Sequence, residues 1–425
     1  MPSLHAILAT MDRPTTAGTE YAARIAFVVE LAEHLHAYGT TTQRLELALV
    51  AVSQRLGLEC EPWTNPTGMI LSFSDPALPP GASDTTRVLR LPPGETDLAR
   101  LSEADRIAES VLAGEIGLAD GKAALDVLAR PPGRRQRVLE TLGFGIVAAA
   151  VAAQLRLPWL DIATAGGTGL LLGALVQLAR PRPRLREAEE AVAGLLAGFV
   201  AVLVAAHVGP LNQNTVIIAS LIALLPGLTL TNAMSELASG HLVAGTARFS
   251  GAATSVLKLT VGTVLAVSLA QLAGIEPEVR ALRPQPDWVE WAGLLAAALS
   301  FAVLFRAAPR DYPVVMLAAA AGYLISRYAG LAWGSPAGIF LSAFALTAAG
   351  NAYARWWNRP GALVRVPGII MLVPGSASLR GLLTLVQQQD VAGGQVALLG
   401  VLNILAALVA GLLFGNLLVS ARRNL

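Results

Sequence analysis

The sequence has little cysteine, little lysine and little charge. Cys60 is the only cysteine among 425 residues, so no disulfide can form within the chain and thiol redox chemistry is not expected. Lysine occurs only at Lys122 and Lys258, and the net charge is +2, so we predict no basic domain for nucleic acid. Walker motifs are lacking, which argues against an ATP-driven pump within this chain.

Charged residues make up only 14% of the sequence, whereas hydrophobic residues make up 54%. A water-soluble surface needs more charge than this. The division is uneven, because long apolar runs follow one another from Val138 onward and the carboxylates concentrate before Glu140. We therefore predict a polytopic α-helical membrane protein with a soluble amino-terminal domain, and only the second part belongs in a lipid bilayer.

Residues 1–137 are predicted to form a compact α+β domain. Apolar residues recur at helical spacing over about 21–38 and 42–56, and a glycine follows each helix as a C-cap would. Short alternating stretches at 69–73 and 86–91 predict strands, and residues 98–113 and 118–130 predict two more helices. The polar first 21 residues lack the order of a signal peptide, so we expect this domain in the cytoplasm.

The rest of the chain divides into about ten apolar segments, each long enough to cross ~30 Å of hydrocarbon as a helix. They lie near residues 139–155, 159–178, 189–207, 213–236, 252–273, 288–306, 312–328, 335–354, 366–388 and 395–419. If the amino-terminal domain is inside, most loop arginines face the cytoplasm and only Arg156, Arg280, Arg283 and Arg327 face outward. Both termini are therefore expected in the cytoplasm.

Two apolar segments contain a Pro-Gly pair followed by a short polar run. Pro226-Gly227 interrupts the fourth segment and Pro374-Gly375 interrupts the ninth, and the spacing between them is close to that between Asp161 and Asp311. This regularity predicts a tandem duplication with five spans in each half, residues 138–275 and 276–425. Because five is an odd number, the second copy would be inverted relative to the first, which is typical of transporters.

The Pro-Gly breaks predict the binding site. A break frees backbone groups that lipid cannot satisfy, and the half-helix after it aims N–H groups at a cavity, which suits a carboxylate. The candidate substrate-binding residues are Pro226, Gly227, Thr229, Thr231, Asn232, Glu236, Pro374, Gly375, Ser376, Ser378 and Arg380. Among them, Glu236 is expected to bind a substrate ammonium or a proton, and Arg380 a carboxylate, because intramembrane charges are costly unless they are functional.

Plainer structural roles compete with these assignments. A Pro-Gly pair inside one apolar helix can be a simple kink. Glu236 and Arg380 can occupy interfacial positions at helix ends. Asp161 and Asp311 are expected at membrane edges as helix caps, and Asn212 and Asn214, which flank Gln213, are expected in an outer loop.

Taken together, these segments resemble the bacterial threonine/serine exporter family, and the resemblance spans essentially the whole chain. The matching residues are His36–Gly39 with Thr42–Arg44 and Glu46, Pro226–Glu236 with Ser239 and Gly240, and Pro367–Gly375 with Arg380 and Gly381. The resemblance implies an amino-terminal domain followed by two five-span membrane domains in the bacterial inner membrane. It also implies export of L-threonine and L-serine, driven by the proton gradient.

Three functions follow from the residues and the resemblance. The first is a secondary exporter of small hydroxylated amino acids that works by alternating access, in which Thr229 or Asn232 would meet the substrate hydroxyl. The second is a dicarboxylate exporter for a substrate such as succinate, as some split-chain relatives imply. In both, protons and the bilayer are expected partners, and a homo-oligomer is left open.

The third function is a membrane-anchored hydrolase with its chemistry in the amino-terminal domain, since this domain of the family has been likened to hydrolases. The sequence contains no His-Glu-x-x-His, no Gly-x-Ser-x-Gly and no Cys-His arrangement. His34 and His36 lie two residues apart, on different faces of a helix, so they cannot chelate one metal. We therefore expect no catalysis, no cofactor and no metal, and a structural or regulatory helical hairpin.

Overall fold

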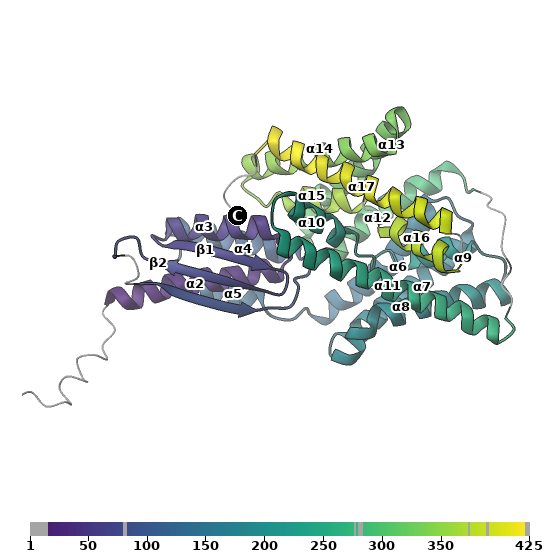
Figure 1. The fold of residues 1–425 in the computed structure, drawn as a ribbon, viewed down its shortest axis with the longest axis horizontal. Coiled ribbons are helices and arrows are strands. Elements are labelled where there is room, and N and C mark those ends of the chain that lie inside the picture. Colours follow the sequence, from purple (N-terminus) through teal and green to yellow (C-terminus); the bar gives the residue numbers. More distant parts are fainter. Residues whose placement is uncertain are drawn as a thin grey trace, which may run out of the picture. The chain divides into compact units, whose positions relative to one another are not determined.

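The computed structural model describes residues 16–79, 83–275, 278, 284–372, 375–387 and 391–420 (Figure 1). The chain separates into two compact units between Arg130 and Pro131. This boundary lies slightly before the predicted one at residue 137, because the first membrane helix already begins at Arg134.

The first unit is an α+β domain with two helices before a small sheet and two after it. The helices are α2 (Thr16–Ala37), α3 (Thr42–Arg55), α4 (Leu98–Leu112) and α5 (Leu118–Leu128). The strands are β1 (Glu59–Asn65), β2 (Gly68–Ser74) and β3 (Thr85–Arg90), which form an antiparallel meander in the order β1-β2-β3. The two predicted strands correspond to β2 and β3, and β1 is an addition to the prediction.

The core of this unit lies between the helices and one face of the sheet. Phe27 and Leu31 of α2, Leu49 of α3, and Leu71 and Phe73 of β2 are almost fully buried in one cluster. The apolar spacing along the helices and the alternation along β2 therefore meet in a single core.

The second unit is entirely helical among the residues that the structure describes. Its elements are α6 (Arg134–Gln154), α7 (Trp159–Ala179), α8 (Pro183–His207), α9 (Gln213–Ser220), α10 (Gly227–Ala238), α11 (Leu242–Leu272), α12 (Asp287–Leu304), η1 (Pro309–Asp311), α13 (Tyr312–Trp333), α14 (Ser335–Trp357), α15 (Ala362–Ile370), α16 (Gly375–Gln387) and α17 (Val391–Leu418). Nine helical segments of the described chain are long and apolar enough to cross a membrane. The predicted segment 213–236 is the exception, because it is divided between the short helices α9 and α10.

The same order of elements occurs twice along this unit. Three long helices, two short helices and a final long helix form the series α6–α11, and the series α12–α17 repeats them. The packing repeats as well, since α8 lies against α11 and α10 against α11 in the first series, whereas α14 lies against α17 and α16 against α17 in the second.

Small residues explain the close packing within each series. A Cβ atom on Gly262 of α11 would collide with the backbone of Ala191 and Leu195 on α8. Likewise, a Cβ atom on Gly411 of α17 would lie 2.7 Å from the Cβ atom of Ala343 on α14. Glycine at such positions lets membrane helices approach closely enough for van der Waals packing, which is the main attraction between helices in lipid.

The first helices of the two series, α6 and α12, pack against each other in antiparallel orientation. Arg306, just after α12, donates from Nε to Oε1 of Glu140 near the start of α6 at 2.7 Å. Arg156, just after α6, pairs with Asp287 at the start of α12. Both arginines have a positive φ, 55° at Arg156 and 51° at Arg306, so the two helices end in the same way.

Candidate functional site

Each broken helix is interrupted where the sequence places its Pro-Gly pair. The helix α9 ends at Ser220 and α10 begins at Gly227, directly after Pro226. In the second series α15 ends at Ile370 and α16 begins at Gly375. The predicted site residue Pro374 lies outside the described residues.

The two interruptions lie against each other in the second unit. A Cβ atom built on Gly375 would lie 3.1 Å from the Cβ atom of Leu225 and 3.4 Å from both the Cα and N atoms of Gly227. The beginnings of α10 and α16 are therefore in van der Waals contact, although 148 residues separate Gly227 from Gly375 along the chain. We call this place the helix crossing, defined by Leu225, Pro226, Gly227 and Gly375.

Apolar side chains from both series surround the helix crossing. Leu379 and Leu383 of α16 are buried with Ile217 of α9 and Leu221 and Leu225 of the first interruption. In the other direction, Leu228 of α10 packs against the cluster that contains Ile369 and Leu372. Each series thus contributes a half-helix to the core of the other, which ties the two halves together at this point.

Few polar residues follow the helix crossing along α10 and α16. Thr231 is 1% exposed, and its Oγ1 has no hydrogen-bond partner among the described residues. Ser378 is buried, and Thr229, Asn232 and Ser376 are half-buried. A buried hydroxyl without a partner costs free energy, so Thr231 is a position that a polar ligand would stabilise.

Glu236 has a partner of its own. It is 2% exposed, and its two carboxylate oxygens accept from Nε of Arg248 on α11 at 3.0 and 2.9 Å. Glu236 lies nine residues beyond Gly227 on the same helix, or about 13 Å along the axis. One small amino acid cannot span this distance, because even an extended residue covers at most ~3.6 Å.

The substrate-binding role of Glu236 stays a prediction and would require Arg248 to release it. The pair sits where α10 turns into α11, beside Gly240, whose φ is 85°. Arg380 is exposed on α16, next to the fully buried Leu379. The structure therefore brings Gly227 and Gly375 together, whereas Glu236 is paired with Arg248 and Arg380 is exposed.

Two buried aspartates hold the segments that lead into the broken helices. Asp161 is fully buried and accepts from Nδ2 of Asn212, the residue before α9, at 2.7 Å. Asp311 is also fully buried and pairs with Arg359, just before α15. As expected, both aspartates lie at helix starts, Asp311 at the N-cap position of α13 and Asp161 in the first turn of α7, but neither side chain makes a capping hydrogen bond, and both instead bind the segment before a broken helix.

Other buried charges were not identified from the sequence. Glu140 is 3% exposed and accepts from Arg180 and Arg306, which join α6 to the ends of α7 and α12. Glu290 of α12 pairs with Arg327 of α13 and accepts from the hydroxyl of Tyr323 at 2.8 Å. The only sequence signal was that each lies inside an apolar segment, and the distant partners cannot be read from spacing.

Two apolar grooves on the second unit are lined by residues outside the helix crossing. One, of about 600 Å³, is lined by α13, α14 and α15, including Trp356 and Trp357. Another, of about 410 Å³, is lined by α6, α7 and α12, including Trp159 and Trp288. Both linings are almost entirely apolar, which suits contact with lipid chains or apolar residues rather than a hydroxylated amino acid.

In the first unit, the residues that carried the family resemblance serve the fold. Nε2 of His36 lies 3.0 Å from the carbonyl oxygen of Pro92. Glu46 accepts from the N–H of Thr64 on β1 at 2.8 Å. Gly39 has a φ of 83° and packs closely against the backbone of Thr96. These contacts join the α2–α3 hairpin to the sheet and to the loop before α4.

Comparison with protein families gives two adjoining matches. A family described as putative threonine/serine exporter matches residues 26–270, and one described as threonine/serine exporter, ThrE, matches residues 291–418. The chain belongs to the threonine/serine exporter family. Family membership confirms the resemblance identified from the sequence, and the apolar helices identify a multi-pass membrane protein of a transporter family.

Curated relatives of the chain include fungal membrane proteins. Pheromone-regulated membrane protein 10 of Pichia sorbitophila is 25% identical over 86% of this chain and 37% of its own length. The proteins of the same name from Candida albicans and Saccharomyces cerevisiae are 26% and 24% identical, over 84% and 92% of this chain and 33% and 51% of their own lengths. The chain thus spans about a third to a half of these relatives. No solved structure matches it.

Proposed function

We propose that this protein is a secondary transporter that exports L-threonine and L-serine by alternating access. The observation that carries the proposal is the contact between the two interruptions, Gly227 against Gly375. Broken helices in corresponding places of two repeats mark the substrate site in several transporter folds. A substrate at this point would separate the first turns of α10 and α16 and bind between them.

The substrate carboxylate is the group that the helix crossing would bind best. The N–H of Gly227 donates to the carbonyl oxygen of Leu225 at 2.8 Å. The other N–H groups in the first turns of α10 and α16 have no partner within their own helices, and the positive end of each helix dipole attracts an anion. The unpaired hydroxyl of Thr231 adds a donor or acceptor for the substrate hydroxyl. These groups favour a small hydroxylated amino acid over an apolar one.

The antiparallel pairing of α6 with α12 supports inverted repeats. These helices occupy the first place in their series, and their reciprocal ion pairs, Glu140 with Arg306 and Arg156 with Asp287, lie at opposite ends of the pair. In alternating access, one end of such a pair opens while the other stays closed. The two ion pairs, on opposite faces of the membrane, would then each stabilise the closed end of the helix pair.

The buried pair of Glu236 and Arg248 is a suitable place for proton coupling. Protonation of Glu236 would remove its charge and release Arg248, and the substrate carboxylate need not take part. The pair lies near the end of α10, on the side where the sequence places cytoplasmic arginines. On the distribution of loop arginines we also propose that both termini lie in the cytoplasm, with the bacterial inner membrane as the location.

Counterflow in proteoliposomes tests the proposed substrate without knowledge of the driving ion. Vesicles preloaded with unlabelled L-threonine or L-serine should take up labelled L-threonine, and vesicles preloaded with succinate should not. If only succinate exchanges for its own label, the protein is a dicarboxylate exporter. Thr231→Val should slow threonine exchange, whereas Thr254→Val should leave it unchanged, because Thr254 is exposed on α11 and bonds only within its own helix.

A further inference from the structure

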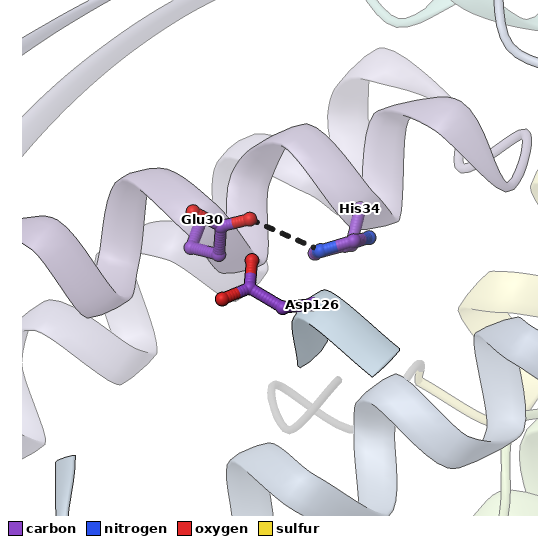
Figure 2. A group of neighbouring side chains, drawn as sticks. All are labelled: Glu30, His34 and Asp126. Atoms are coloured by element: carbon purple, nitrogen blue, oxygen red, sulfur yellow. Dashed lines mark ion pairs between the residues drawn. The ribbon is translucent and has the colours of Figure 1, made fainter. Parts of the chain in front are cut away.

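Three side chains of the types that bind metal ions come together in the first unit (Figure 2). They are Glu30 and His34 on α2 and Asp126 on α5. We propose that Glu30, His34 and Asp126 form a binding site for a divalent transition-metal ion such as Zn²⁺. This site is separate from the proposed transport function.

The helices place these groups together for simple geometric reasons. Glu30 and His34 are four residues apart and therefore lie on the same face of α2. The helix α5 packs against α2 and brings Asp126 to that face. One ligand atom from each residue lies within 4.8 Å of the other two, and Nε2 of His34 lies 3.2 Å from Oε1 of Glu30.

A small adjustment would give these atoms metal-binding distances. Ligand atoms about 2.1 Å from a tetrahedral Zn²⁺ are about 3.4 Å from one another. Because Asp126 is exposed, its side chain can turn toward the other two without disturbing the core. Glu30 is half-buried at the same place, so both carboxylates remain accessible to an ion.

The hydrogen bonding of His34 also points to a ligand. His34 is 6% exposed, and its Nε2 faces the two carboxylates, where it forms an ion pair with Glu30 but no hydrogen bond of acceptable geometry among the described residues. Its other nitrogen, Nδ1, lies 2.9 Å from the hydroxyl of Tyr38. A metal-bound histidine usually donates its second ring N–H to an oxygen, and Tyr38 is placed to accept it.

The ligand set indicates which class of ion would bind. One imidazole nitrogen and two carboxylates favour Zn²⁺, Co²⁺ or Mn²⁺ over Mg²⁺ and Ca²⁺, which prefer oxygen ligands alone. Three protein ligands leave a fourth position for water, as in catalytic rather than structural zinc sites. Lys122 opposes binding, because its Nζ lies 3.7 Å from Oε2 of Glu30, but its side chain is 45% exposed and can move into solvent.

Cobalt binding to the full-length, tag-free protein in detergent tests the site. After treatment with a chelator, the protein should bind one Co²⁺ per chain in equilibrium dialysis and develop the visible absorption of cobalt with nitrogen and oxygen ligands. We expect His34→Gln, Glu30→Gln and Asp126→Asn each to weaken binding at least tenfold. Tyr38→Phe should weaken it about 10–100-fold, because the hydroxyl that accepts from Nδ1 of His34 is lost.

Matched variants on the same helices serve as controls. Glu20→Gln on α2 and Asp120→Asn on α5 remove carboxylates that are outside the cluster, so they should leave the cobalt affinity unchanged. Asp126 is exposed, and its substitution therefore tests the site even if His34→Gln fails to fold. Absence of saturable binding in the wild type, or binding that survives Asp126→Asn, would overturn the proposal.

Discussion

At the scale of single residues, buried charges in the second unit have partners that are distant in the sequence. Glu140, Asp161, Asp311 and Glu236 are each less than 4% exposed and bond to Arg306, Asn212, Arg359 and Arg248 respectively. The sequence showed that such carboxylates lie in apolar segments. It could not show their partners, because the partners lie 12 to 166 residues away and depend on helix packing.

Substitution of Glu236 should separate net transport from exchange. Glu236→Gln cannot bind or release a proton, so we predict loss of proton-driven threonine efflux while threonine counterflow continues. Net efflux under a pH gradient and counterflow in the same proteoliposomes measure the two activities. The control is Glu190→Gln, which removes a half-buried carboxylate that pairs with Lys258 and should leave both activities intact. Undiminished net efflux in Glu236→Gln would show that this carboxylate does not couple protons.

Cys60 should react slowly with alkylating reagents while the first unit is folded. The thiol is 8% exposed, and burial raises the pKa of Cys60 to about 11. An unfolded cysteine has a pKa of ≈ 8.5. The folded state therefore holds the proton more tightly, so this contribution to stability is complete below pH ~8.5 and is lost as the pH rises toward 11.

Two measurements check this account of Cys60. Alkylation at neutral pH should be slow in the native protein and rapid after unfolding. Thermal unfolding should show a loss of stability at alkaline pH that is smaller in Cys60→Ala. Rapid alkylation of the native protein would mean that the thiol is accessible.

At the scale of elements, sequence periodicity located the helices well where they are continuous. The predicted segments 159–178 and 335–354 correspond closely to α7 and α14. The strand β1 was missed because its sequence, Glu-Cys-Glu-Pro-Trp-Thr-Asn, contains proline and several polar residues. Its pairing with β2 over seven residues stabilises it, and pairing is a tertiary interaction that local propensity does not record.

The close approach of α8 and α11 should depend on the absence of a side chain at Gly262. Gly262→Ala would place a methyl group against the backbone of Ala191 and Leu195, which cannot move as a flexible side chain could. We expect a loss of about 1–3 kcal/mol, the usual cost of overpacking. Gly251→Ala on the same helix meets open space and should be neutral or stabilising. Thermal unfolding of the purified variants compares them, and equal stability would contradict the packing described.

The two ion pairs between α6 and α12 should differ in strength. Arg306 and Glu140 have side chains that are 14% and 4% exposed, whereas Arg156 and Asp287 are 33% and 78% exposed. Arg306→Gln should cost about 1–3 kcal/mol, since Arg180 still neutralises Glu140, and Arg156→Gln should cost at most about 1 kcal/mol. The midpoint of thermal unfolding measures both, and a larger effect at Arg156 would reverse the expected order.

At the scale of the whole molecule, the two Pro-Gly breaks predicted an internal duplication, and the order of helices in α6–α11 recurs in α12–α17. Asp161 and Asp311 are spaced along the chain much like the two Pro-Gly pairs. Each of these aspartates binds the segment before a broken helix, α9 or α15. Sequence alone did not reveal that the interruptions touch, that Glu236 is paired with Arg248, or that Arg380 is exposed. Those facts depend on which faces of α10 and α16 pack inward, and a five-span repeat allows several arrangements.

A reversible cross-link at the helix crossing tests the central claim most directly. In a Cys60→Ala background, Leu225→Cys and Gly375→Cys would place two sulfur-bearing side chains with Cβ atoms about 3.1 Å apart, close to the ~3.8 Å of a disulfide. If the substrate passes between the interruptions, oxidation should stop threonine counterflow and reduction should restore it, while the counterflow of each single-cysteine variant should be the same in both conditions. Full counterflow through the cross-linked protein would contradict the proposal that this contact opens during transport.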